Sequence, residues 1–151
     1  MNREILFRGK RIDNGEWAYS QTVFSHLDNF YIPTQNLKCT VMRNLDTVGN
    51  ISEIRCKDGK CFFKVHPETV GQFTGLTDKN GKKIFEGDIV KTKFGRICKV
   101  IFFQSPCYCG IDLIPLEDKH KCPDKFDLYL SDNLEIIGNI HDNPDLTEVN
   151  K

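Results

Sequence analysis

Four residues in the second half of the chain have the chemistry of a zinc site: Cys107, Cys109, His120 and Cys122. They form two pairs, Cys107 with Cys109 and His120 with Cys122, and one residue separates the members of each. On a strand, both side chains of a pair would therefore lie on the same face. Three thiolates and one imidazole are ligands that tetrahedral zinc accepts. The spacing nevertheless differs from the Cys-x-x-Cys of common zinc sites. We therefore favour cysteines scattered in a surface loop, with no metal and no cofactor.

A second thiol pair, Cys56 and Cys61, flanks Asp58-Gly59, a dipeptide that favours a two-residue hairpin turn. Such a turn would place the two cysteines opposite each other with Cα atoms about 4.5 Å apart, at the short limit for a disulfide. The chain has 7 cysteines, an odd number, and no apolar signal core follows Arg3 and Glu4. We therefore favour free thiols in a reducing compartment.

Catalytic motifs are absent from the sequence. It contains no Gly-x-Ser-x-Gly, no phosphate-binding Gly-x-x-x-x-Gly-Lys-Ser/Thr and no His-Glu-x-x-His. His141 and Asp142 are neighbours, but a single His-Asp pair is more typical of a solvated turn than of an active site. The expectation is a protein that is not an enzyme.

A modest basic patch surrounds one aromatic residue, Phe94. Its members are Lys91, Lys93, Arg96 and Lys99. On a strand, Lys91 and Lys93 would share a face opposite Thr92 and Phe94. Small barrels often bind nucleic-acid strands with such residues. Basic and acidic residues number 21 each in the whole chain, however, so we favour a solvated outer face and keep nucleic-acid contact as the alternative.

The elements that would position these residues are short strands. Residues 4–12 and 16–20 flank Asp13-Asn14-Gly15, which predicts a hairpin with Trp17 and Tyr19 facing the core. Residues 51–65 predict a second hairpin, and Pro67 a one-turn helix over 66–70.

Two turns lie close together in the middle of the chain. They are Asp78-Lys79-Asn80-Gly81 and Gly87-Asp88, and both are rich in residues that favour turns. We expect Asp78, Glu86 and Asp88 to bond nearby backbone N–H groups, since an EF-hand spacing is absent. The remaining strands are predicted over residues 89–94, 97–103, 108–116, 126–130 and 134–140, and no helical periodicity interrupts them.

Three ordered blocks resemble the YopX family of phage and prophage proteins: Arg3–Lys10, Gln72–Val90 and Leu134–Leu146. The resemblance implies a small, mostly-β, phage-encoded protein with an SH3-like barrel in its C-terminal part. The family carries no established activity, so the resemblance implies no catalytic residues.

The sequence as a whole predicts a mainly-β protein with very little helix. We expect an N-terminal β-hairpin subdomain over residues 1–66, a second subdomain over 67–146 and a frayed tail over 147–151. The short strands of the second subdomain favour a small closed barrel or a sandwich, and the resemblance implies that it is an SH3-like small β-barrel. No apolar run is long enough to span a bilayer, so a cytoplasmic protein is expected. The family resemblance implies that the cell is a bacterial host. A net charge of zero makes self-association easier. The expected function is that of a non-catalytic homo-oligomer that binds a phage or host protein.

Overall fold

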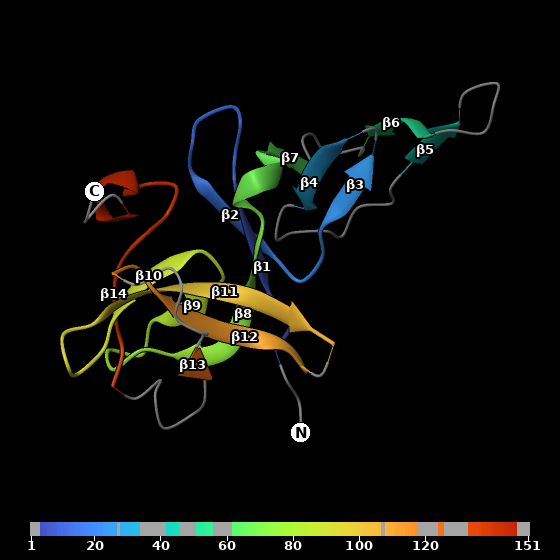
Figure 1. Ribbon diagram of the computed structural model, residues 1–151. Coiled ribbons are helices and arrows are strands. Elements are labelled where there is room, and N and C mark those ends of the chain that lie inside the picture. The colour runs from blue at the N-terminus through green and yellow to red at the C-terminus, as the bar shows by residue number, and fades with distance from the viewer. Residues whose placement is uncertain are drawn as a thin grey trace. The chain divides into compact units, whose positions relative to one another are not determined.

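The computed structural model describes residues 4–26, 28–33, 42–45, 51–55, 62–106, 108–117, 124–125 and 133–147. These residues are mainly β, as expected, and their helices are two short 3₁₀ turns (Figure 1). The chain divides into an N-terminal unit, Leu6–Val70, and a C-terminal unit, Met1–Ile5 with Gly71–Lys151. The predicted boundaries at 66/67 and 146/147 stay predictions.

The N-terminal unit contains three antiparallel groups of strands. β1 (Phe7–Lys10) pairs with β2 (Trp17–Ser20), and β5 (Met42–Leu45) pairs with β6 (Ile51–Arg55). A three-stranded sheet has the order β3 (Phe24–His26), β4 (Asn29–Pro33), β7 (Phe62–Val65). The hairpin predicted over residues 51–65 is therefore wrong, because β6 pairs with β5 whereas β7 pairs with β4.

The core of this unit forms around Ile32 and Val65, both fully buried. Gly9 and Ala18 lie opposite each other in the β1–β2 hairpin. A Cβ added at Gly9 would lie 3.0 Å from both Ile32 Cδ1 and Val65 Cγ2, so only small residues fit on this face of the hairpin. The sequence prediction had placed larger residues there.

Trp17 and Tyr19 flank Ala18 and so lie on the other face of β2; their predicted core position is wrong. Trp17 is half-buried and Tyr19 exposed. The Trp17 ring instead forms a cation–π contact with the Arg8 guanidinium, whose central carbon is 4.6 Å from the ring centroid. The aromatic surface of Trp17 thus covers a buried cation.

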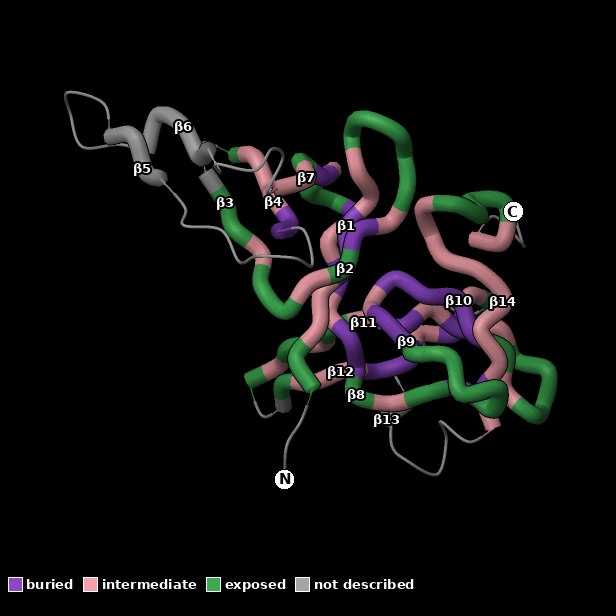
Figure 2. Tube along the Cα trace, turned by 180° about the vertical axis from the view of Figure 1, so that it is seen from behind, coloured by how far each residue is buried: buried purple, intermediate pink, exposed green. Residues whose placement is uncertain are grey.

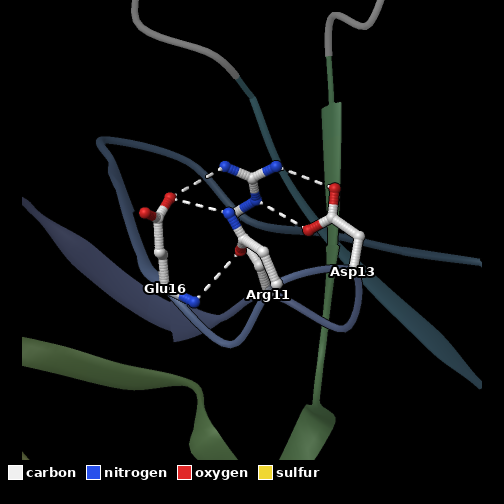
Figure 3. Close-up of polar contacts among 4 residues, drawn as sticks. Arg11, Asp13 and Glu16 are labelled. Atoms are coloured by element: carbon white, nitrogen blue, oxygen red, sulfur yellow. Dashed lines mark hydrogen bonds and ion pairs between the residues drawn. The ribbon is translucent and has the colours of Figure 1, made fainter.

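The turn of the β1–β2 hairpin is held by a polar network around Arg11 (Figure 3). Arg11 donates two hydrogen bonds to Asp13, at 2.9 and 2.7 Å, and one to Glu16 at 3.4 Å. Its guanidinium also lies 3.8 Å from the centre of the Phe63 ring on β7. The hydrogen bonds of Arg11 thus close the turn, and the contact of its guanidinium with Phe63 holds the turn against β7, which is a structural role.

The predicted one-turn helix over 66–70 is present as the 3₁₀ helix η1 (Pro67–Thr69). The Thr69 hydroxyl donates to the His66 carbonyl at 2.7 Å and accepts from the Lys10 amide at 2.8 Å. The His66 amide donates to the Lys10 carbonyl at 2.9 Å. These bonds attach η1 to the end of β1.

The C-terminal unit pairs β8 (Gly71–Thr77) with β9 (Lys83–Phe85) and contains a five-stranded antiparallel sheet. The order of that sheet is β13 (Asp124–Lys125), β12 (Tyr108–Pro115), β11 (Ile97–Ser105), β10 (Asp88–Lys91), β14 (Glu135–Asn139). The 3₁₀ helix η2 (Pro144–Thr147) follows. No sheet of the described residues closes into a barrel, because β13 and β14, the two edge strands of the five-stranded sheet, do not pair with each other. The predicted SH3-like barrel is therefore not confirmed.

The core of this unit lies between β9 and one face of the five-stranded sheet. Its buried residues are Ile84, Val90, Cys98, Val100, Leu113 and Leu134. Figure 2 shows the buried positions gathered along β9, β10 and β11. Alternation along β11 directs Cys98 and Val100 inward, which sets Lys99 on the opposite face. Among the described residues, no helix has the length and apolarity that a bilayer crossing requires.

Candidate interaction surfaces

The basic residues predicted as a nucleic-acid contact lie on the β10–β11 hairpin. Its turn, Thr92–Arg96, is closed by three hydrogen bonds: Thr92 N to Arg96 O at 2.9 Å, Gly95 N to Thr92 O at 2.9 Å, and Arg96 N to Thr92 Oγ1 at 3.2 Å. Gly95 adopts a φ of +83° that L-residues with a Cβ disfavour. The turn therefore has a defined shape, and residues 93 and 94 form its tip.

Lys91 and Lys93 do not share a strand face, contrary to the expectation. Lys91 ends β10 opposite Ile97, whereas Lys93 lies in the turn beside Phe94. The Lys93 Nζ is 5.1 Å from the centre of the Phe94 ring. The Phe94 side chain is 86% exposed, so the turn presents an aromatic ring and its neighbouring cation together.

The stem of the hairpin carries two further cations, the exposed Lys91 and the half-buried Lys99. Lys91 and Lys99 both lie opposite the core side, which Val90 and Cys98 occupy. Glu135 on β14 lies opposite Lys91 in the strand register. Its carboxylate also forms a 2.7 Å ion pair with Lys79. One acid thus offsets part of the charge of the stem.

A second exposed surface lies at the connected end of β11 and β12, which we call the ribbon end (Ile101–Phe103 with Cys109–Ile111). On the inner face, the Val100–Leu113 pair is buried. The next pair on that face is Phe102–Ile111, and there Phe102 is 49% exposed. The apolar face therefore continues beyond the core.

The zinc candidate cannot be assembled from the described residues. Cys109 is an exposed thiol on β12, opposite Gln104, whereas Cys107, His120 and Cys122 lie outside the described residues. No group of three or more His, Cys, Asp or Glu residues that could hold a metal occurs in the described part. Cys56 and Cys61 also lie outside it. The structure therefore does not test the zinc alternative or the pairing of Cys56 with Cys61, and the expectation of free thiols without a metal stays a prediction.

The acids of the two central turns bond backbone amides, as predicted for Asp78 and Asp88. Asp78 Oδ1 accepts from the Asn80 amide at 2.8 Å and from the Lys82 amide at 2.9 Å, while Oδ2 accepts from the Ile136 amide at 3.2 Å. Asp88 Oδ2 accepts from the Phe85 amide at 2.8 Å. These carboxylates are therefore occupied by the fold.

The pKa of Asp78 lies below its ordinary value for the same reason. Burial of the carboxyl raises its pKa, but the hydrogen bonds from the amides of Lys82, Ile136 and Asn80 together lower the pKa by more. The ionised form is thus the one that the turn stabilises.

His141 and Asp142 form part of a turn, as expected. The amides of both residues donate to Asn139 Oδ1 at 2.9 Å, and Asn139 Nδ2 donates to the Asp142 carboxylate at 2.7 Å. The pair therefore shapes the segment that follows β14.

One depression, of about 460 Å³, lies on the N-terminal unit. Apolar side chains line it (Phe7, Val23, Phe30 and Val70), together with Gln21, Thr22 and Ser25. None of these described lining residues is ionisable, so they supply no general acid, base or charged ligand.

The sequence prediction missed Phe94 and Phe102 as exposed residues. Gly95 was the available signal for Phe94, because a glycine between basic residues marks a turn and removes its neighbours from the strand. Phe102 had no such signal, since the strand alternation continues through it and only the extent of the core decides its exposure.

Comparison with known proteins agrees with the three sequence blocks. No protein of curated function matches the chain. A solved structure, protein EF1440 from Enterococcus faecalis, aligns with 95% of this chain and 98% of its own at 18% identity and a TM-score of 0.44. The YopX protein family matches residues 6–148, nearly the whole chain. The chain therefore belongs to the YopX family.

Proposed function

We propose that this YopX-family protein is a non-catalytic interaction protein that assembles with copies of itself through the ribbon end. It would be phage- or prophage-encoded and would act in the cytoplasm of the host cell on a phage or host protein. The observation that carries the proposal is Phe102, which is 49% exposed on a strand face that is fully buried two residues earlier.

The ribbon end has only two strands in the described part of the chain. β10 pairs with β11 over Ile97–Lys99, so from Ile101 onward β12 is the strand partner of β11 (Figure 1). Both faces of this end are apolar, since Phe102 lies on one face and Ile101 and Phe103 lie half-buried on the other. A two-stranded ribbon with apolar faces is stabilised when further protein covers it.

In the described part of the chain, the ribbon end also has one strand edge without a strand partner. β13 pairs with β12 at Asp112 and Leu113. Within the described residues, Cys109–Ile111 have β11 on one side and no strand on the other. Such an edge is a template for pairing with another chain, and two copies could pair their β12 edges about a two-fold axis.

Light scattering in line with a size column tests self-assembly. We expect an oligomer for the wild-type protein and a shift to the monomer for Phe102→Lys, because a charge at the centre of the interface would be desolvated without a partner. Ile5→Lys is the matched control, since Ile5 is similarly exposed (53%) but lies outside the ribbon end. A wild-type monomer at every soluble concentration, or equal dissociation by both variants, would contradict the proposal.

Nucleic-acid binding through Lys91, Lys93, Arg96 and Lys99 is a second candidate function. It is favoured by local charge, since residues 89–111 contain these four cations and no acid although the whole chain has zero net charge. We expect the double variant Lys91→Glu/Lys99→Glu to weaken DNA binding and to flatten its salt dependence. Fluorescence anisotropy at several salt concentrations measures both quantities, and an affinity that does not fall with added salt would exclude backbone contact.

A further inference from the structure

We propose that the tip of the β10–β11 hairpin binds single-stranded nucleic acid by stacking a base on the Phe94 ring. This inference rests on the nucleic-acid-binding function proposed above and names its ligand and its central residue. Phe94 was absent from the contact residues predicted from the sequence.

The geometry of the turn presents the ring for stacking. Three hydrogen bonds close Thr92–Arg96, so the ring is carried by a shaped turn. Phe94 is 86% exposed, and a Cβ added at the neighbouring Gly95 would meet nothing within 4 Å. With the Lys93 ammonium over one side of the ring, the other side remains available to a flat base.

The charges around the ring suit a phosphate backbone. Arg96 and Lys93 lie in the turn with Phe94, and the exposed Lys91 and the half-buried Lys99 follow on the stem. Among the described residues, the acid Glu135 pairs with Lys91 at the last position of β10 and so lies below the tip. A strand could therefore stack at the tip while its phosphates contact the cations toward the stem.

A single strand fits this surface better than a duplex does. In a duplex the faces of each base are covered by its neighbours, so a protein ring could reach a base face only after unstacking it. A single strand offers its base faces without that cost, and aromatic stacking then adds to the charge attraction. The exposed ring is thus the feature that separates the two ligands.

Fluorescence anisotropy with three probes tests this inference. The probes are labelled oligothymidylate of about 12 nucleotides, a duplex of equal length, and heparin as a competitor that has charge without bases. We expect the oligothymidylate to bind more tightly than the duplex, and Phe94→Ala to weaken its binding about tenfold while leaving duplex binding unchanged. Phe94→Trp should retain affinity, and the fluorescence of the added indole should be quenched on binding.

Tyr19→Ala is the control, because Tyr19 is an exposed aromatic residue outside the hairpin and its loss should leave binding unchanged. Equal binding of all three polyanions that does not depend on Phe94 would overturn the stacking inference and leave charge-based binding intact. Failure of every polyanion to bind would overturn both this inference and the nucleic-acid-binding function.

Discussion

Asp78→Asn is expected to lower the free energy of unfolding of the C-terminal unit by about 3 kcal/mol. The Asp78 side chain is 5% exposed and accepts three backbone amides, one of which, from Ile136, comes from β14. Hydrogen bonds to a charged acceptor contribute more than neutral ones, and the amide group of Asn would turn a donor toward some of these N–H groups. Urea unfolding followed by far-UV circular dichroism measures the loss.

The neighbouring residue supplies a matched control. Lys79→Ala removes a 2.7 Å ion pair with Glu135, but both side chains are almost half exposed, so the expected loss is below about 1 kcal/mol. Equal losses for the two variants would show that the buried carboxylate has no special role.

The loss caused by Asp78→Asn should also depend on pH. Because the folded pKa of Asp78 lies below its ordinary value of 3.8, the stabilisation is fully present above that value and is lost as pH falls through the folded pKa. The difference between wild type and variant should therefore be constant near neutral pH and shrink below about pH 4. A difference that stays constant into strong acid would show that the charge does not contribute.

Local turn chemistry was predictable because it depends on neighbouring residues. Asp78 bonds the amides two and four residues ahead, and Asp88 bonds an amide three residues back. Such bonds follow from side-chain length and turn geometry alone. The sequence could not predict that Asp78 also bonds Ile136, 58 residues away, which depends on how β14 joins the sheet.

Strand pairing and strand facing were harder to predict because they depend on distant partners. Trp17 and Tyr19 alternate with Ala18, and either face satisfies the same period. Because Gly9 lies so close to Ile32 and Val65, only the face of the hairpin that carries small residues can pack against this core. Likewise, no local feature of β6 and β7 indicates that each pairs with a different strand.

The sequence predicted which residues form the basic surface of the β10–β11 hairpin, but it placed two of them wrongly relative to each other. The four cations do lie around one hairpin, but a turn that begins at Thr92 places Lys93 beside Phe94 instead of beside Lys91. A strand extended by two residues would have hidden the ring or spread the cations over one face. The position of the turn therefore decides whether this hairpin resembles a solvated edge or a stacking surface.

Gly71→Ala is expected to destabilise the C-terminal unit by about 3 kcal/mol, as overpacking against rigid backbone does. An added Cβ would lie 2.6 Å from the carbonyl oxygen of Glu86, closer than real Cβ contacts. The Glu86 amide donates to Gln72 at 2.9 Å, and Gly87 donates to Val100 at 2.9 Å while accepting from Ile140 at 3.0 Å. These three hydrogen bonds fix the Glu86–Gly87 turn, so it cannot move away from the new methyl group.

Gly95→Ala separates this steric effect from the general cost of replacing glycine. Gly95 has a φ of +83° but open space around it, so Ala there should cost only the left-handed backbone strain, about 1 kcal/mol. Urea midpoints at equal slope would compare the two variants directly. If Gly71→Ala were no worse than Gly95→Ala, the Glu86 turn would have to move freely, and its three hydrogen bonds would not fix the junction between β9 and β10. A larger loss at Gly71 would instead show that this turn joins the β8–β9 pair rigidly to the five-stranded sheet that carries both proposed surfaces.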